Sequence, residues 1–233
     1  MKKMNKEKIL LHICCAPCAT ESFLRLKEVG FEPIGYFYNP NIYPKSEHDK
    51  RYDECVSFCK SMSYELKEID YDYSLEHKRW LEHIKGLESE KENGKRCIKC
   101  FEFRLKKAFE KANSLTMAGR YTTSLTISPH KDSKAIFEVA GLISVAQKNK
   151  EQKNKDYEKY DKKKQNEKKE NNIKDITKTC KRIKDKNKNE YSSVFFEIDF
   201  KKKAGFEKSV ILSREHNLYR QHYCGCEFSM RDI

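Results

Sequence analysis

Strand-like and helix-like segments alternate along most of this 233-residue chain. An apolar run, Lys8–Ile13, precedes an amphipathic stretch, Thr20–Val29, and Phe31–Tyr38 then alternates like a second strand. Further strand-like segments are expected at 64–71, 119–128 and 191–200, and helix-like ones at 46–62, 74–89, 97–112 and 134–146. Strands that alternate with helices predict an α/β fold in which helices cover both faces of a mostly parallel sheet.

The charge of the chain is unevenly distributed. Of the formal net charge of +13, the segment 147–190 supplies +8, with 17 Lys and Arg against 9 Asp and Glu, so the remainder carries +5. This segment holds no Gly or Pro and too few apolar residues to offset the entropy of ordering it. We therefore predict one domain, 1–233, with a flexible Lys-rich insertion at 147–190; an arm that contacts nucleic acid is the alternative.

Hydropathy and cysteine usage indicate the compartment. No apolar run approaches the ~18 to 20 residues needed to cross a bilayer, and no small-residue cleavage site follows the apolar run that ends at Ile13. We therefore expect a cytoplasmic protein with no membrane partner. In that compartment thiols are kept reduced, so ten cysteines favour metal or redox use over structural disulfides.

Seven of the ten cysteines fall into three close groups. These are Cys14, Cys15 and Cys18; Cys97 and Cys100; Cys224 and Cys226. Adjacent cysteines are too constrained to bind one tetrahedral ion comfortably, but each can bind a different iron of a cubane. The first pair and the two-residue spacing of the second group together supply four thiolates, enough for a [4Fe-4S] cluster. A closed four-cysteine zinc site is the alternative.

The predicted position of the first group suits an anionic centre. It lies where a strand ends and a helix begins, and backbone N–H groups and the helix dipole favour negative charge there. Cys224-Gly225-Cys226 suggests different chemistry, because a disulfide in so small a ring would be strained and easily reduced. We interpret it as a redox-active dithiol. In the alternative, these two thiols bind a second metal, with Cys18 as a third ligand.

Several motifs together resemble the QueH-type epoxyqueuosine reductases. The resemblance covers nearly the whole chain except its first residues and the insertion, which replaces a connection that is usually short. The matching residues are His12-Ile13-Cys14-Cys15-Ala16-Pro17-Cys18, Tyr38-Asn39-Pro40-Asn41-Ile42, Arg96-Cys97 with Cys100 and Arg104-Leu105, Thr122-Thr123 with Ser128-Pro129, and Tyr219-Arg220-Gln221 with Tyr223-Cys224-Gly225-Cys226.

The resemblance implies a Rossmann-like body related to adenine-nucleotide hydrolases of the HUP class. It also implies a cobalamin-independent oxidoreductase that reduces epoxyqueuosine to queuosine at the wobble position of tRNA, with an electron donor that the sequence does not identify. By this resemblance Cys14, Cys15, Cys97 and Cys100 hold the cluster, and Cys224 and Cys226 are the redox pair. An additional iron occurs in some members, and Cys18 is its candidate ligand here.

Polar residues at predicted strand ends are candidate substrate contacts. Open α/β sheets bind ligands in the crevice at the carboxyl ends of their strands. The candidates there are Asn39, Asn41, Thr122, Thr123 and Ser128. Arg220, among the aromatic residues of the C-terminal segment, combines charge with stacking faces, as single-stranded RNA loops require. Turn formation for the asparagines and a solvated basic tail for Arg220 are the alternatives.

Two other functions fit some of these features. An ATP-dependent tRNA-thiolation enzyme would share the fold and the cysteines, but it needs a glycine-rich phosphate loop where this chain has Cys-Cys-Ala-Pro-Cys. A zinc-stapled tRNA-binding module is the non-enzymatic rival. Candidate proton donors for the reductase are His12, Tyr36 and Tyr223, each of which packing alone could explain.

Overall fold

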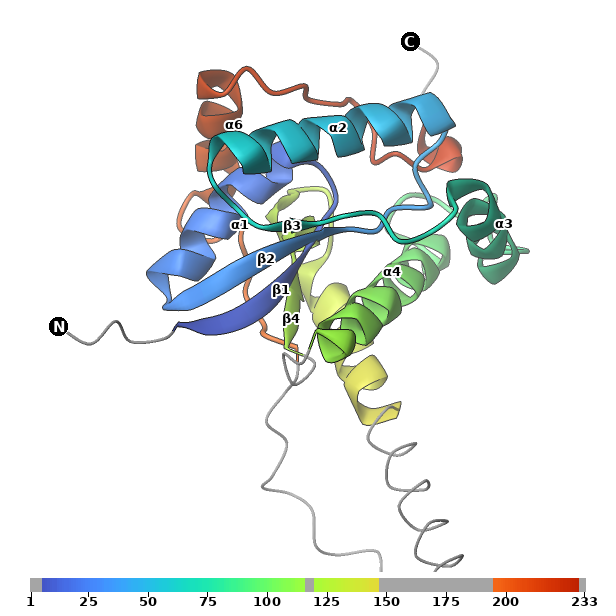
Figure 1. Ribbon diagram of the computed structural model, residues 1–233. Helices are drawn as coiled ribbons and strands as arrows, with labels where there is room; N and C mark the ends of the chain where they lie inside the picture. The colour runs from blue at the N-terminus through green and yellow to red at the C-terminus, as the bar shows by residue number, and fades with distance from the viewer. Residues whose placement is uncertain (1–5, 116–119, 147–194, 231–233) are drawn as a thin grey trace, which may run out of the picture. The chain divides into compact units, whose positions relative to one another are not determined.

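The computed structural model describes residues 6–115, 120–146 and 195–230 (Figure 1). One compact unit combines Met1–Ile143 with Val194–Ile233. Ser144–Ser193 form a second unit, which lies almost wholly outside the described residues, as does the predicted insertion at 147–190. Within the described residues, no helix has both the length and the apolar character that a membrane span requires.

A four-stranded sheet forms the centre of the first unit. Its strands are β1 (Glu7–Ile13), β2 (Phe31–Phe37), β3 (Leu66–Lys67) and β4 (Tyr121–Thr123). They are all parallel and lie in the order β3-β2-β1-β4, with Leu10 of β1 opposite Ile34 on one side and Tyr121 on the other. Ile9 to Leu11 are fully buried, as expected for a strand covered on both faces. The predicted α/β fold with a Rossmann-like parallel sheet is confirmed.

Helices pack on both faces of this sheet, as Figure 1 shows. They are α1 (Ala16–Glu28), α2 (Lys45–Ser61), α3 (Tyr73–His83), α4 (Lys95–Ser114), a helix at 133–146 and α6 (Gly205–Glu215). Phe23 of α1 and Phe58 of α2 pack with Ile9 and Leu11 in one core cluster. On the opposite face, Leu105 of α4 and the helix at 133–146 pack with Leu10 and Tyr36.

The predicted strand at 191–200 is wrong in the part that is described. The segment pairs with the sheet at a single parallel bridge, between Phe195 and Tyr121, and then leaves it. The hydroxyl of Thr122 donates a hydrogen bond of 2.9 Å to the carbonyl of Phe196, so a side chain replaces the next bond of the ladder. The apolar pattern of this segment reflects burial against the sheet, not a fifth strand.

Two other predicted strands are shorter than expected. Of 64–71, only Leu66–Lys67 pairs with β2. Of 119–128, Tyr121–Thr123 forms β4 and Ser124–Ile127 forms a 3-10 helix. The Thr123 hydroxyl caps that helix by accepting a hydrogen bond of 3.2 Å from the N–H of Leu125, which ends the strand. The chain thus turns at the carboxyl edge of the sheet, beside the end of β1.

Candidate metal centre

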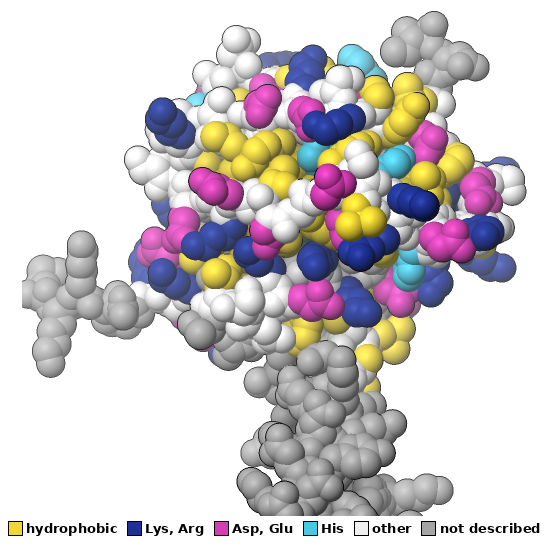
Figure 2. Space-filling model, turned by 45° about the vertical axis from the view of Figure 1, so that its right-hand side comes forward, with side chains coloured by type: hydrophobic (Ala, Val, Ile, Leu, Met, Phe, Trp, Pro, Cys, Tyr) yellow, Lys and Arg dark blue, Asp and Glu magenta, His cyan; other side chains and the backbone are white. Residues whose placement is uncertain are grey.

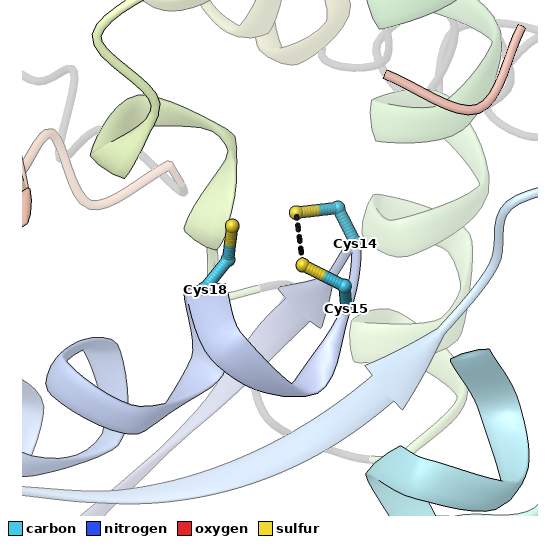
Figure 3. Close-up of side chains that lie close together, drawn as sticks. All are labelled: Cys14, Cys15 and Cys18. Atoms are coloured by element: carbon cyan, nitrogen blue, oxygen red, sulfur yellow. Dashed lines mark hydrogen bonds between the residues drawn. The ribbon is translucent and has the colours of Figure 1, made fainter. Parts of the chain in front are cut away.

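Three cysteines meet where β1 ends and α1 begins. Cys14 follows the strand, Cys15 is the N-cap residue of α1, and Cys18 lies in its first turn. Their sulfurs all lie within 4.8 Å of one another, and Cys14 Sγ and Cys15 Sγ are 3.9 Å apart. Figure 3 shows the three thiol groups directed into the same space. This is a set of three soft ligands fixed by one strand-to-helix turn.

Polar groups from distant parts of the chain hold this turn in place. The N–H of Cys14 donates to Ser124 Oγ (3.1 Å), and the Ser124 hydroxyl donates back to Cys14 Sγ (3.4 Å). Gln221 Nε2 donates to Cys15 Sγ at 3.1 Å. The 3-10 helix after β4 and the C-terminal segment therefore both support the first cysteine group.

The electrostatics of the turn favour a negative charge on sulfur. The first turn of α1 holds no acidic residue, so the positive end of its dipole is unopposed. Hydrogen bonds from the thiols of Cys15 and Cys18 lower the pKa of Cys14 well below its usual value. The hydrogen bond to Cys14 raises the pKa of Cys15 to about 12. Of these thiols, Cys14 therefore loses its proton most readily, and a bound cation would favour that loss further.

Cys97 and Cys100 occupy the first turns of α4, which also begins without an acidic residue. The N–H of Asn93 donates to Cys97 Sγ at 3.2 Å. Burial raises the pKa of both thiols, and the charge of Arg104 opposes this effect at Cys100. A second helix N-terminus therefore presents two sulfurs, that of Cys100 buried and that of Cys97 half-buried.

The C-terminal dithiol packs beside this pair. Cys226 belongs to the same buried cluster as Cys100, with Cys224 packed against it, and all four thiols line one cavity of about 20 Å³. Gly225 has φ of +110°, and a Cβ there would lie 2.8 Å from Ile42 Cγ1. Only glycine fits this backbone, so it fixes how the two thiols are presented.

The two thiols of the C-terminal pair are chemically unequal. A hydrogen bond from Cys226 lowers the pKa of Cys224 well below its usual value, and the hydrogen bond to Cys224 raises that of Cys226. The Ser229 hydroxyl also lies 3.1 Å from Cys224 Sγ. Of the two thiols, Cys224 is therefore the one that loses its proton more readily.

A larger cavity of about 570 Å³ adjoins the smaller one. Cys14, Cys18 and Cys224 line it, and Cys224, Arg104 and Lys131 line both cavities. Burial alone would lower the pKa of Lys131. The electrostatic effect of Cys224 and Cys14 acts in the opposite direction, and the pKa of Lys131 is raised. All three cysteine groups that were identified in the sequence thus lie around two adjoining cavities.

The cysteine set predicted for the cluster is only partly gathered. In the described part of the chain, the three cysteines of the first group are the only set whose ligand atoms approach as closely as one ion requires. Cys97 and Cys100 lie outside that set. In a cubane each cysteine binds a different iron, so its ligands need not be this close. The assignment of Cys14, Cys15, Cys97 and Cys100 to one cluster therefore stays a prediction.

Buried polar atoms around the thiols fit an anionic group. Three buried N–H groups have no hydrogen-bond partner among the described residues: Trp80 Nε1, Arg96 Nε and Arg104 Nε. All three side chains line the smaller cavity. Unpaired buried donors are costly, and the structure gathers them beside four sulfurs. Cationic and N–H groups around thiolates suit a negatively charged iron–sulfur centre.

The predicted substrate residues separate into two sets. Ser128 and Arg220 line the larger cavity, and Asn41 lines the smaller one with its buried Oδ1 unpartnered among the described residues. Asn39, Thr122 and Thr123 are buried and bonded within the fold. Asn39 Nδ2 donates to the carbonyl of Ile13 (2.8 Å), Thr122 Oγ1 to that of Phe196, and Thr123 Oγ1 lies 2.8 Å from His12 Nδ1. The bonds of Asn39 and Thr123 join the ends of neighbouring strands, and the bond of Thr122 joins β4 to the segment that follows Phe195.

The proton-donor candidates also differ in position. His12 is fully buried, and burial lowers its pKa to about 3. Tyr36 is fully buried too, and its hydroxyl donates to Asp70 at 3.2 Å. Tyr223 lines the larger cavity, where its hydroxyl donates to the carbonyl of Tyr43 at 2.6 Å. Of the three, only Tyr223 lies at the cavity that holds the thiols.

Sequence reasoning missed three residues of this centre. Ser124 falls within a segment predicted as a strand, although it directly follows the predicted Thr122-Thr123 pair. Lys131 stands in an unremarkable turn, and nothing local indicates that it faces sulfur. Trp80 is the single tryptophan of the chain, and its rarity was the only available signal.

Proteins with similar sequences share one family description. The sequence model of the family described as "Epoxyqueuosine reductase QueH" matches residues 9–175 and 167–232. Proteins with that description are similar to this chain in Streptococcus pyogenes serotype M1 (29% identity; 99% of this chain and 73% of the relative), Haemophilus influenzae (30%; 97% and 72%) and Thermotoga maritima (27%; 95% and 90%). The chain therefore belongs to the epoxyqueuosine reductase QueH family, a family of oxidoreductases.

Proposed function

We propose that this protein reduces epoxyqueuosine to queuosine at the wobble position of tRNA. The main observation in support of this proposal is that three cysteine groups, far apart in sequence, surround two adjoining cavities. The larger cavity can admit a nucleoside. Its volume of about 570 Å³ lies within the range of roughly 300–1,000 Å³ that is typical of small-molecule sites. The thiols therefore stand where a substrate can reach them.

We assign the [4Fe-4S] cluster to Cys14, Cys15, Cys97 and Cys100. The cluster supplies single electrons when bound. The protein contributes two helix N-termini that stabilise its negative charge, together with the buried donors of Arg96 and Arg104. Cys18, within 4.8 Å of the first two sulfurs, is available for an additional iron.

We assign the redox role to Cys224 and Cys226. Removing the epoxide oxygen as water consumes two electrons and two protons and leaves a carbon–carbon double bond. Oxidation of two thiols to one disulfide releases two electrons and two protons, so this pair balances the reaction. An external electron donor must then reduce the disulfide. The hydrogen bond from Cys226 lowers the pKa of Cys224, and a lower thiol pKa favours the thiolate through which thiol–disulfide exchange proceeds.

The lining of the larger cavity suits RNA. Aromatic faces and positive charge are contributed by Phe206, Tyr223, His130, His222 and Arg220. The Arg220 guanidinium lies 5.6 Å from the centre of the Phe206 ring. Single-stranded loops are recognised by stacking of splayed bases and by contacts to the backbone. We therefore assign Arg220 and Ser128 to the tRNA substrate. The other predicted substrate residues would instead hold the backbone around the site in place through their hydrogen bonds; these are Asn39, Thr122 and Thr123.

Charge on the body of the protein is mixed. On the face that Figure 2 shows, Lys and Arg side chains are interspersed with Asp and Glu and with apolar patches. A surface of this kind provides little long-range attraction for RNA, so we assign tRNA recognition to the cavity and its rim. We place the reaction in the cytoplasm and the whole activity in one domain, 1–233, of which 147–190 is an insertion.

A zinc-stapled tRNA-binding module is the second candidate. Three sulfurs within 4.8 Å of one another are the observation in its favour, since this spacing also suits a single ion. The ATP-dependent thiolation enzyme has weaker support, because the turn after β1 carries cysteines where a phosphate loop needs glycines.

Anaerobic reconstitution with iron and sulfide, followed by absorption and EPR spectroscopy, distinguishes the two leading candidates. The reductase should become brown and, with a chemical reductant, should convert epoxyqueuosine in tRNA to queuosine, as measured by mass spectrometry of the nucleosides. A colourless protein with stoichiometric zinc and no conversion would establish the binding module instead.

Cysteine variants test the division of roles. Cys14→Ala should prevent cluster assembly, whereas Cys224→Ser should keep the cluster and lose turnover. The matched control is Cys59→Ala, because Cys59 is buried in the core between α2 and the sheet, away from the site. It should keep both properties. Equal cluster loss in the first two variants would contradict the assigned roles.

A further inference from the structure

Trp80 lies against the thiols although it belongs to none of the sequence motifs. It is on α3, whose N-cap residue, Asp72, accepts a hydrogen bond of 2.7 Å from the N–H of Leu75. The Trp80 side chain is fully buried and packs with Cys100 and Cys226. A large aromatic ring is therefore fixed at the sulfur-lined cavity.

The indole N–H is the unexplained part of this side chain. Trp80 Nε1 is buried, and no described residue gives it a regular hydrogen bond. Leaving such a donor unpaired is costly, so a purely structural role would favour phenylalanine. A tryptophan is justified here if its N–H gains a partner when the site is occupied.

The partner that the geometry offers is the sulfur of Cys100. Trp80 and Cys100 belong to one buried cluster and line the same small cavity, and Trp80 opposes the rise in the pKa of the Cys100 thiol that burial causes. A second donor, Arg104 Nη1, lies 4.0 Å from the same atom. Two N–H groups from different helices therefore converge on one cysteine sulfur.

Stacking holds the indole in this orientation. The ring of His77 stacks on it with centroids 5.7 Å apart, and Phe228 contacts it with centroids 6.3 Å apart. The ring cannot turn its N–H toward solvent, because the side chain has no exposed surface. The direction of the donor is thus set by the fold before anything binds.

We propose that the indole N–H of Trp80 donates a hydrogen bond to the Cys100 sulfur of the assembled metal centre and raises the reduction potential of that centre. Negative charge on the ligating sulfurs increases when the centre accepts an electron, so a donor stabilises the reduced state more than the oxidised state. Trp80 is a positioning residue for electron transfer. This inference rests on the proposed function, since it requires Cys100 to be a ligand.

A single-atom replacement tests the proposal. Because the chain has one tryptophan, a tryptophan auxotroph supplied with β-(3-benzothienyl)alanine replaces only Trp80 and exchanges the N–H for sulfur. Iron and sulfide content and the unfolding temperature should not change. At a fixed ambient potential, the ratio of reduced to oxidised cluster should fall about fivefold, the size of one net hydrogen bond.

Two variants complete the test. Trp80→Phe should shift the midpoint potential in the same direction, whereas Ile84→Val, which trims the same buried cluster without removing a donor, should leave it unchanged. A cluster that assembles with an unaltered potential in the benzothienylalanine protein overturns the role of Trp80 and leaves the proposed function intact. Failure of the unsubstituted protein to assemble any cluster overturns both.

Discussion

Replacing Gly225 with alanine should disrupt the C-terminal dithiol through two separable effects. The residue has φ of +110°, a conformation that side-chain-bearing residues rarely adopt. A Cβ at this position would lie 2.8 Å from Ile42 Cγ1 and 2.9 Å from Arg51 Nη1. Neither neighbour can move easily, since Ile42 is 1% exposed and Arg51 is 2% exposed and bonded to Glu47 at 2.7 Å.

The expected loss of stability follows from these two effects. Backbone strain at a positive φ costs on the order of 1–3 kcal/mol. Overpacking of a filled site costs roughly another 1–3 kcal/mol. The total of about 2–6 kcal/mol should lower the unfolding temperature by ~4–24 °C, since 1 kcal/mol shifts a domain of this size by roughly 2–4 °C. Reductase activity should fall as well, because the loop that carries Cys224 and Cys226 is displaced.

Two other glycines provide matched controls in a thermal unfolding series. Gly86 has φ of +82°, and a Cβ added there would meet no heavy atom within 4 Å, so Gly86→Ala should show the strain alone. Gly141 lies in the helix at 133–146 with open space around it, so Gly141→Ala should stabilise by about 0.5–1 kcal/mol. If Gly225→Ala unfolds no earlier than Gly86→Ala and keeps full activity, the close packing of this loop is refuted.

Three further predictions concern single residues. Trp80 fluorescence should be strongly quenched when iron and sulfide are added, because the indole packs against the thiols; unchanged emission would contradict its placement. Burial lowers the pKa of His48, so protonation of this side chain favours the unfolded chain. The free energy of unfolding is therefore highest above the ordinary His pKa of about 6.5 and decreases as the pH falls below it. Urea unfolding between pH 5 and 7 should accordingly show a weaker acid dependence in His48→Gln. Ser124→Ala removes the hydroxyl bonded to Cys14 and should weaken iron retention about 10-fold or more in chelator competition, whereas Ser57→Ala, at an exposed site on α2, should not.

The sequence alone determined the fold class and indicated the candidate reactive residues. Alternating strand and helix patterns predicted the parallel sheet, because each pattern arises locally from which face of a segment is buried. The three cysteine groups were visible for the same reason, since Cys14 and Cys18 are brought together by one turn of one helix. Family motifs then connected these groups to a reaction.

Only the tertiary structure decided which groups face one another. Gln221 donates to Cys15 across 206 positions of the chain, and Trp80, Cys100 and Cys226 meet from three separate segments. The burial of Asn39 and Thr122 within the fold, and the departure of the chain from the sheet after Phe195, were likewise not visible in local patterns. Such contacts depend on how complete elements pack, and no short stretch of sequence contains that information.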